Sequence, residues 1–254
     1  MSGHGPRHRR TASSSGGGVR RLGLGTARAL AAEGVAVALC GRRQDVLLDA
    51  VASITADGGD ATGIVADVGT AAGATDFVTQ AKEALGGVDI LVTNAGGPGG
   101  GGFADTSYDD FEKALHLNLL STVAMCQAAV PDMQAAGWGR VVAITSVSVR
   151  QPIPSLILSN TARAGATGFL KTLALEVAPD GVTVNSIQPG THDTDRIRQL
   201  HGDDVSGAAA AVPVGRLGDA DDFGAAAAFL CSEQAKFITG ASLNVDGGAY
   251  RGLQ

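Results

Sequence analysis

The sequence predicts a single-domain α/β protein built on a doubly wound parallel sheet, and three observations support this fold class. The chain has 254 residues, 44% of them hydrophobic, which suits one α/β domain with a covered sheet. Short apolar runs alternate with helical patterns, as in right-handed βαβ crossovers. The apolar runs are continuous, as expected for strands buried on both faces. A Rossmann-type sheet follows from these features.

From residue 22 onward, strands and helices are expected to alternate, with two consecutive helices at 108–118 and 119–136. A helix at 22–33 ends at Gly34, and the helix at 71–85 ends at the pair Gly86-Gly87, because glycine closes helices in the left-handed conformation. The full expected order is helix 22–33, strand 35–40, helix 44–56, strand 63–66, helix 71–85, strand 88–93, helices 108–118 and 119–136, strand 140–145, helix 155–177, strand 182–187, helix 220–231 and strand 241–245.

Residues 1–20 differ from the rest, so the expected organisation is a disordered or degenerate segment at 1–20 and a domain at 21–254. The segment is rich in Gly, Ser, Arg and His and has no hydrophobic periodicity. It also lacks the apolar core of a secretory signal. Its basic residues read as a solvated tail.

Charge and cysteine content argue against several classes of function. The net charge of -6 and pI near 5.3 disfavour a general nucleic-acid binder. Cys40, Cys126 and Cys231 show no metal or disulfide spacing, so we expect reduced, buried thiols in a cytoplasmic protein. Without an uninterrupted apolar run of 18 residues, no membrane span is expected.

Five short motifs stand at the ends of expected strands or inside expected helices. They are Asp67-Val68, Asn94-Ala95-Gly96, Asn118, the run from Val184 to Pro189-Gly190 with Thr194 beyond it, and the pair Thr239-Gly240 with Val245-Asp246-Gly247-Gly248. In this order the chain resembles the short-chain dehydrogenase/reductase family from about residue 22 to 248. It looks closest to the branch similar to 3-oxoacyl-acyl-carrier-protein reductase.

The resemblance implies a catalytic tetrad that is degenerate here. Family members carry Asn, Ser and Tyr-x-x-x-Lys, with the Tyr as general acid and base and the Lys lowering its pKa and binding ribose. Asn118 and Ser146 match, whereas Ser159 stands for the Tyr and Arg163 for the Lys. A Ser hydroxyl is a poor proton donor, and Arg163 can hold ribose hydroxyls but cannot relay a proton. Impaired activity is therefore expected.

The glycine-rich loop of the family is also altered. Counting back from Gly34 places its third glycine at Gly23 and its first at Gly17, with Arg21 in the middle position. An alternative register uses 11–16 and an insertion of about five residues. Either register puts the first strand within 5–15, where Val, Ile, Leu and Phe are all missing. A degenerate N-terminus and a reading-frame or start-site error upstream of residue 22 both account for this.

Other family positions predict the cofactor. Gly41 after the second strand is followed by Arg42 and Arg43, which favours the 2′-phosphate of NADP over NAD. By resemblance, further cofactor contacts are expected at Asp67, Val68, Asn94, Gly96, Arg163, Pro189, Gly190 and Thr194, and residues 191–212 form a substrate lid.

The resemblance implies an NADP(H)-dependent oxidoreductase acting on a small-molecule or acyl-carrier-linked carbonyl, such as a 3-oxoacyl group. The alternative is a non-catalytic scaffold of the same family, a nucleotide sensor or an oligomerisation partner. A homodimer or homotetramer is expected through helices 119–136 and 155–177, where Ala164, Gly165 and Gly168 permit close packing.

Overall fold

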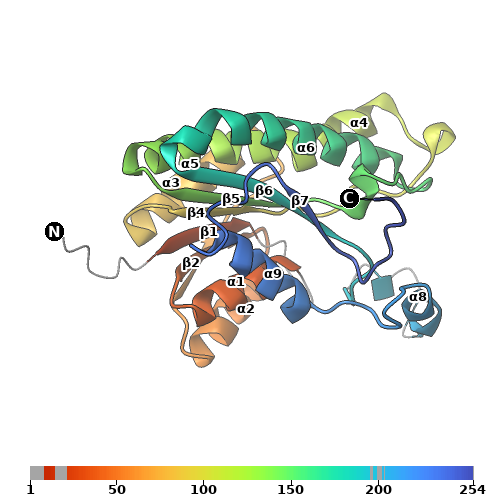
Figure 1. Ribbon diagram of the computed structural model, residues 1–254, viewed down its shortest axis with the longest axis horizontal. Helices are drawn as coiled ribbons and strands as arrows, with labels where there is room; N and C mark the ends of the chain where they lie inside the picture. The colour runs from red at the N-terminus through yellow and green to blue at the C-terminus, as the bar shows by residue number, and fades with distance from the viewer. Residues whose placement is uncertain (1–8, 15–21, 195–196, 199–201, 203, 254) are drawn as a thin grey trace.

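The computed structural model describes residues 9–14, 22–194, 197–198, 202 and 204–253. Its seven strands form one sheet in the order β3-β2-β1-β4-β5-β6-β7, and every neighbouring pair is parallel. Helices α3, α5 and α6 cover one face of the sheet, and α1, α2 and α9 cover the other (Figure 1). The predicted doubly wound sheet is confirmed.

The strands are β1 (Arg10–Ser14), β2 (Ala36–Gly41), β3 (Ala61–Val65), β4 (Ile90–Thr93), β5 (Gly139–Ile144), β6 (Val182–Pro189) and β7 (Ser242–Val245). The α-helices are α1 (Leu22–Ala32), α2 (Gln44–Ala56), α3 (Ala71–Leu85), α4 (Tyr108–Leu115), α5 (Ser121–Ala136), α6 (Ile157–Val177), α8 (Ser206–Ala210) and α9 (Ala220–Cys231). The predicted bounds of α2, α3 and α9 are confirmed residue for residue. Helix α8 was not predicted, because its Ala-Gly run carries no amphipathic pattern.

Residues 10–14 form the first strand, which both registers placed within 5–15, so this part of the disordered or degenerate segment 1–20 is ordered. They form β1 in the middle of the sheet, with Thr11 paired to Val37 of β2 and Ile90 of β4. The strand forms because Thr11, Ala12 and Ser13 are small enough to be fully buried and their backbone is paired on both sides. The hydroxyls of Thr11 and Ser13 have no partner among the described residues, a cost that an apolar strand would avoid. The other positions of 1–20, Arg9 excepted, lie outside the described residues.

Two apolar cores lie on the two faces of the sheet. One is centred on Phe77, Met125 and Leu170, and the other on Ile54 and Phe223. Burying each such side chain contributes roughly 1.5–3 kcal/mol. Because helices cover both faces of the sheet, a ligand can be contacted only from the loops at its edges. In open α/β sheets this happens at the carboxyl edge.

The predicted helices 108–118 and 119–136 form one continuous helical run, interrupted by a π-helical turn at His116–Leu120. By length and composition the run Tyr108–Ala136 could cross a membrane. Half of its most apolar window is buried inside the protein, however, as in the core helix of a globular domain.

Candidate active site at the carboxyl edge of the sheet

The loops after β4, β5 and β6 meet at the carboxyl edge of the sheet, where open α/β sheets bind ligands. Two of the predicted tetrad side chains reach the backbone of these loops. Asn118 donates a hydrogen bond to the Gly96 carbonyl at 3.0 Å. Arg163 donates to the Ala95 carbonyl at 3.0 Å. Residues from a π-turn and from α6 therefore converge on the loop that follows β4.

Arg163 is buried, with 8% of its surface exposed, and it donates hydrogen bonds to three backbone carbonyls. Its Nη1 donates to Ile144 at 2.8 Å and Thr145 at 3.1 Å, in addition to the Nη2 bond to Ala95. Burial lowers the pKa of Arg163 to about 10. Because a guanidinium has five N–H donors, the Nε hydrogen and one Nη2 hydrogen are not used by these bonds. The predicted ribose contact stays a prediction, limited to those two hydrogens.

Asn118 lies in the π-turn, a distortion that is frequent at functional sites. The side chain is 5% exposed. Its Nδ2 is used by Gly96, while Oδ1 is buried without a partner among the described residues. An unpaired amide oxygen in this position can accept from a ligand hydroxyl or an ordered water.

Ser146 and Ser159 occupy the remaining two tetrad positions. Ser146 follows β5 and is half-buried, and its Oγ accepts a hydrogen bond from the Ser148 backbone at 3.1 Å. Because that bond uses a lone pair, the Ser146 hydroxyl hydrogen is available for a carbonyl oxygen. Ser159 lies one helical turn before Arg163 and is 7% exposed.

The residues predicted to bind the adenosine half lie at the ends of β2 and β3. Arg42 is exposed directly after β2, just before α2 begins. Asp67 is exposed after β3, and its Oδ1 accepts from the Gly69 backbone at 3.0 Å. Val68 beside it is half-buried. The Ala66 backbone donates to Gly41 at 3.2 Å, which joins the two strand ends.

The other predicted cofactor positions extend from α1 to the loop after β6. Gly23 is buried in the first turn of α1, whereas Gly17 lies outside the described residues. Gly190 follows β6, and a Cβ there would lie 2.6 Å from the Asp246 Cβ, so packing against Asp246 already requires glycine. Asn94, Gly96 and Thr194 follow their strands as predicted, whereas Pro189 is the last residue of β6, which extends beyond its predicted end at 187. Asn94, Pro189 and Thr194 are half-buried, and Gly96 is exposed.

The described residues fit a dinucleotide at this edge. A Cβ on Gly96 or Gly97 would meet nothing within 4 Å, so there is open space above the loop after β4. The unpaired Oδ1 of Asn118 and the two remaining Arg163 hydrogens are polar groups suited to ribose and nicotinamide. A cavity of about 270 Å³ is lined by Leu117 and Leu158, the chain neighbours of Asn118 and Ser159.

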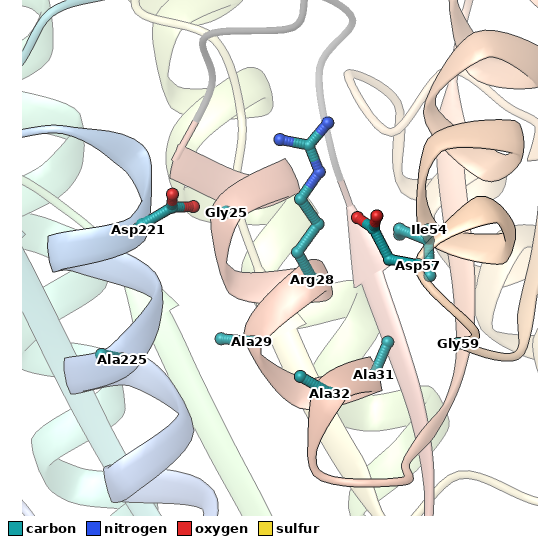
Figure 2. A pocket seen from close by; sticks show the side chains of 10 residues that line it. All are labelled: Gly25, Arg28, Ala29, Ala31, Ala32, Ile54, Asp57, Gly59, Asp221 and Ala225. Atoms are coloured by element: carbon teal, nitrogen blue, oxygen red, sulfur yellow. The ribbon is translucent and has the colours of Figure 1, made fainter.

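A second cavity of about 370 Å³ lies on the outer face of α1, between α9 and the end of α2. Figure 2 shows Arg28 rising from α1 with Asp57 on one side and Asp221 on the other. None of the predicted site residues lines this cavity, which separates it from the carboxyl-edge chemistry.

Sequence reasoning missed one structural feature beside the site, the backbone pairing at the base of the predicted lid. Asp193 donates from its backbone to the Gly218 carbonyl at 2.8 Å, and Gly218 donates to the Thr191 carbonyl at 3.1 Å. His192, between Thr191 and Asp193, is 4% exposed and inward-facing. The only signal in the sequence was His192, two residues after Gly190, and the spacing of the motifs gives that histidine no role.

The fold and this edge are those of a nucleotide-binding α/β protein. A family model described as enoyl-(acyl carrier protein) reductase matches residues 18–250. Dehydrogenase/reductase SDR family member 4 of Sus scrofa is 36% identical over 241 residues, covering 94% of this chain and 85% of that protein. The human protein of the same name is 35% identical over the same shares.

Solved structures agree with the sequence relatives. A variant of actinorhodin polyketide ketoreductase with NADPH has a TM-score of 0.88 and 29% identity, covering 95% of this chain and 97% of that one. A blue fluorescent protein from a metagenomic library, in complex with NADPH, has a TM-score of 0.86 and 30% identity, covering 96% and 98%. The chain belongs to the short-chain dehydrogenase/reductase family.

Proposed function

We propose that this protein is an NADP(H)-dependent oxidoreductase that transfers hydride to or from the carbonyl carbon of a small-molecule or acyl-carrier-linked substrate. The observation that carries the proposal is the convergence of Asn118 and Arg163 on the loop after β4, beside the exposed space at Gly96. The exposed Arg42 and Arg43 after β2 support NADP over NAD, because guanidinium groups match a phosphate. The relatives solved with NADPH support the same choice.

When bound, the nicotinamide supplies or accepts the hydride. The chain's own residues orient the substrate: the Ser146 hydroxyl donates to the carbonyl oxygen, and the Asn118 Oδ1 holds a water or ribose hydroxyl. The Ser159 hydroxyl is too weak an acid to protonate the substrate oxygen, so that proton comes from solvent. Losing a positioned general acid lowers a rate by roughly 10²–10⁴-fold. The expected enzyme is slow.

A calorimetric titration with NADP⁺ and with NAD⁺ tests the cofactor half of the proposal. We expect tighter binding of NADP⁺, and a preference that shrinks in the double variant Arg42→Ala with Arg43→Ala. Absence of binding by both nucleotides would overturn the proposal. If NADP⁺ binds, oxidation of NADPH over a panel of ketones and 3-oxoacyl thioesters then tests the reaction itself.

The second candidate is a non-catalytic member of the family that senses nucleotide or pairs with another subunit. It is favoured by the Arg163 guanidinium, which donates to three backbone carbonyls and so has fewer donors left for a cofactor. Its signature is NADP⁺ binding without turnover of any panel substrate.

Assembly and compartment are also part of the proposal. Ala164 and Gly168 are exposed on α6, which leaves a flat face for a second copy in a homodimer or homotetramer. Burial raises the pKa of Cys126 and Cys231 to about 12, so these thiols stay protonated. Inert free thiols suit the cytoplasm, where disulfides are rare.

A further inference from the structure

The segment between β6 and α9 is closed at its base by a short parallel pairing. The Gly218 backbone donates to the Thr191 carbonyl and accepts from the Asp193 N–H, so that His192 and Gly218 form an isolated parallel bridge. We call residues 191–193 and Gly218 the lid neck. Gly190 precedes the neck and Thr194 follows it. The position of the neck therefore determines where these two predicted cofactor-binding residues lie.

His192 fills the inner side of the lid neck. Its ring meets Phe223 edge to face, with centroids 5.5 Å apart and an interplanar angle of 87°. Its Nδ1 lies 3.2 Å from the Gly190 carbonyl oxygen. Because a carbonyl only accepts, Nδ1 carries the hydrogen, and in the neutral ring Nε2 then holds a lone pair. That Nε2 is buried and has no partner among the described residues.

Gly218 packs directly on the Nε2 side of the ring. A Cβ on Gly218 would lie 2.6 Å from Nε2 and Cδ2, so the ring and the neck backbone are in close contact. Protonating Nε2 would add a charged N–H that faces this backbone without an acceptor in place. A buried N–H without an acceptor is costly, and a charged one more so.

The surrounding charges do not reverse this preference for the neutral ring. Burial lowers the pKa of His192, and Arg216 acts in the same direction; the Gly190 carbonyl and the carboxylates of Asp222 and Asp219 oppose it. Asp222 is held 2.5 Å from Arg216. His192 and Asp246 both line a cavity of about 300 Å³. The Asp246 carboxylate accepts hydrogen bonds from the backbones of Gly248 and Tyr250.

We propose that neutral His192 is a positioning residue that holds the lid neck closed against Gly190 and Gly218, so that acid loosens the neck and weakens cofactor binding. The inference rests on the proposed function for its cofactor half. The neck itself is a property of this chain and can be measured without cofactor.

The test compares wild type with His192→Asn and His192→Leu. The Asn amide can still donate to the Gly190 carbonyl but does not titrate, while Leu keeps bulk and loses the hydrogen bond. NADP⁺ affinity is measured by calorimetry from pH 5.5 to 8. The 2′-phosphate of the cofactor itself titrates at about pH 6. This change is common to all three proteins and cancels in ratios of Kd.

We expect wild type and His192→Asn to bind equally at pH 8. At pH 5.5 wild type should weaken relative to the variant by up to roughly tenfold, because that pH lies about one unit below the ordinary pKa of histidine. His192→Leu should bind more weakly than His192→Asn at every pH by a constant factor. A wild-type to Asn ratio that does not change with pH overturns the inference.

Amide hydrogen exchange of the cofactor-free protein gives the second readout. After correction for intrinsic rates, the amides of Asp193 and Gly218 should lose protection below pH 6.5 in wild type and keep it in His192→Asn. If NADP⁺ binds at no pH, the proposed function fails while the exchange result still decides the role of His192. Protection that is equally pH-independent in both proteins would refute that role.

Discussion

Arg10 and Asp89 join the first strand to the fourth through a two-pronged ion pair. The Nε and Nη2 of Arg10 each lie 3.0 Å from a different carboxylate oxygen of Asp89, and the Arg10 backbone N–H adds a bond of 3.1 Å. Arg10 opens β1, and Asp89 directly precedes β4. A strand without large apolar side chains is thus held in register by a charged pair at its start.

Replacing Arg10 with Met should lower the free energy of unfolding by about 1–3 kcal/mol, because charge-assisted hydrogen bonds at a half-buried site are lost. Urea denaturation measures the change. Arg43→Met is the matched control: its ion pair with Asp45 is exposed, at 3.7 Å, and should contribute less than about 0.5 kcal/mol. Equal effects of the two changes would contradict a special role for the Arg10–Asp89 pair.

Replacing Arg163 with Met should destabilise the protein by about 2–4 kcal/mol, because two buried carbonyls and one part-buried carbonyl each lose a donor. Arg163→Lys keeps a charge but cannot reach all three carbonyls, and we expect about half that loss. Denaturation without cofactor measures both. If Arg163→Met left stability unchanged while abolishing NADP⁺ binding, Arg163 would act on the ribose and not on the backbone.

The double change Ser159→Tyr with Arg163→Lys restores the family's acid and its neighbour one helical turn away. We expect a gain in ketone reduction of roughly 10²–10⁴-fold, the contribution of a positioned general acid. Ser159→Phe with Arg163→Lys adds the same ring without the hydroxyl and should show no gain. If both variants fold and bind NADP⁺ but neither gains activity, the defect lies in the substrate pocket or the glycine-rich loop.

Helices α1 and α9 touch through glycine. A Cβ on Gly25 would lie 2.1 Å from the Ala220 carbonyl oxygen, and one on Gly224 would lie 2.4 Å from the Gly25 oxygen. Either Gly→Ala change should cost about 1–3 kcal/mol, since backbone must move. Gly207→Ala, which meets nothing within 4 Å in the helix α8, should instead stabilise by about 0.5 kcal/mol. Thermal unfolding separates the two outcomes.

The sheet and most helices could be predicted because their signals are local. The bounds of α2 and α9 follow from apolar periodicity, and Gly86 ends α3 in the left-handed conformation at φ 74°. The π-turn around Asn118 could not be predicted, since its residues read as ordinary helix. In the structure this turn carries Asn118, whose side chain donates to the Gly96 carbonyl.

By itself, the sequence determined the alternation of strands and helices and the motifs at their carboxyl ends. It also revealed that Ser159 and Arg163 stand where the family has Tyr and Lys. The tertiary structure alone decided how the polar residues 10–14 are buried and paired on both sides, that Arg163 donates to three carbonyls, and that the His192 ring packs against Gly218. The physical reason is common to all three. Burial and hydrogen bonding depend on groups that lie far apart in the chain, and the local sequence pattern does not reveal which distant groups come together.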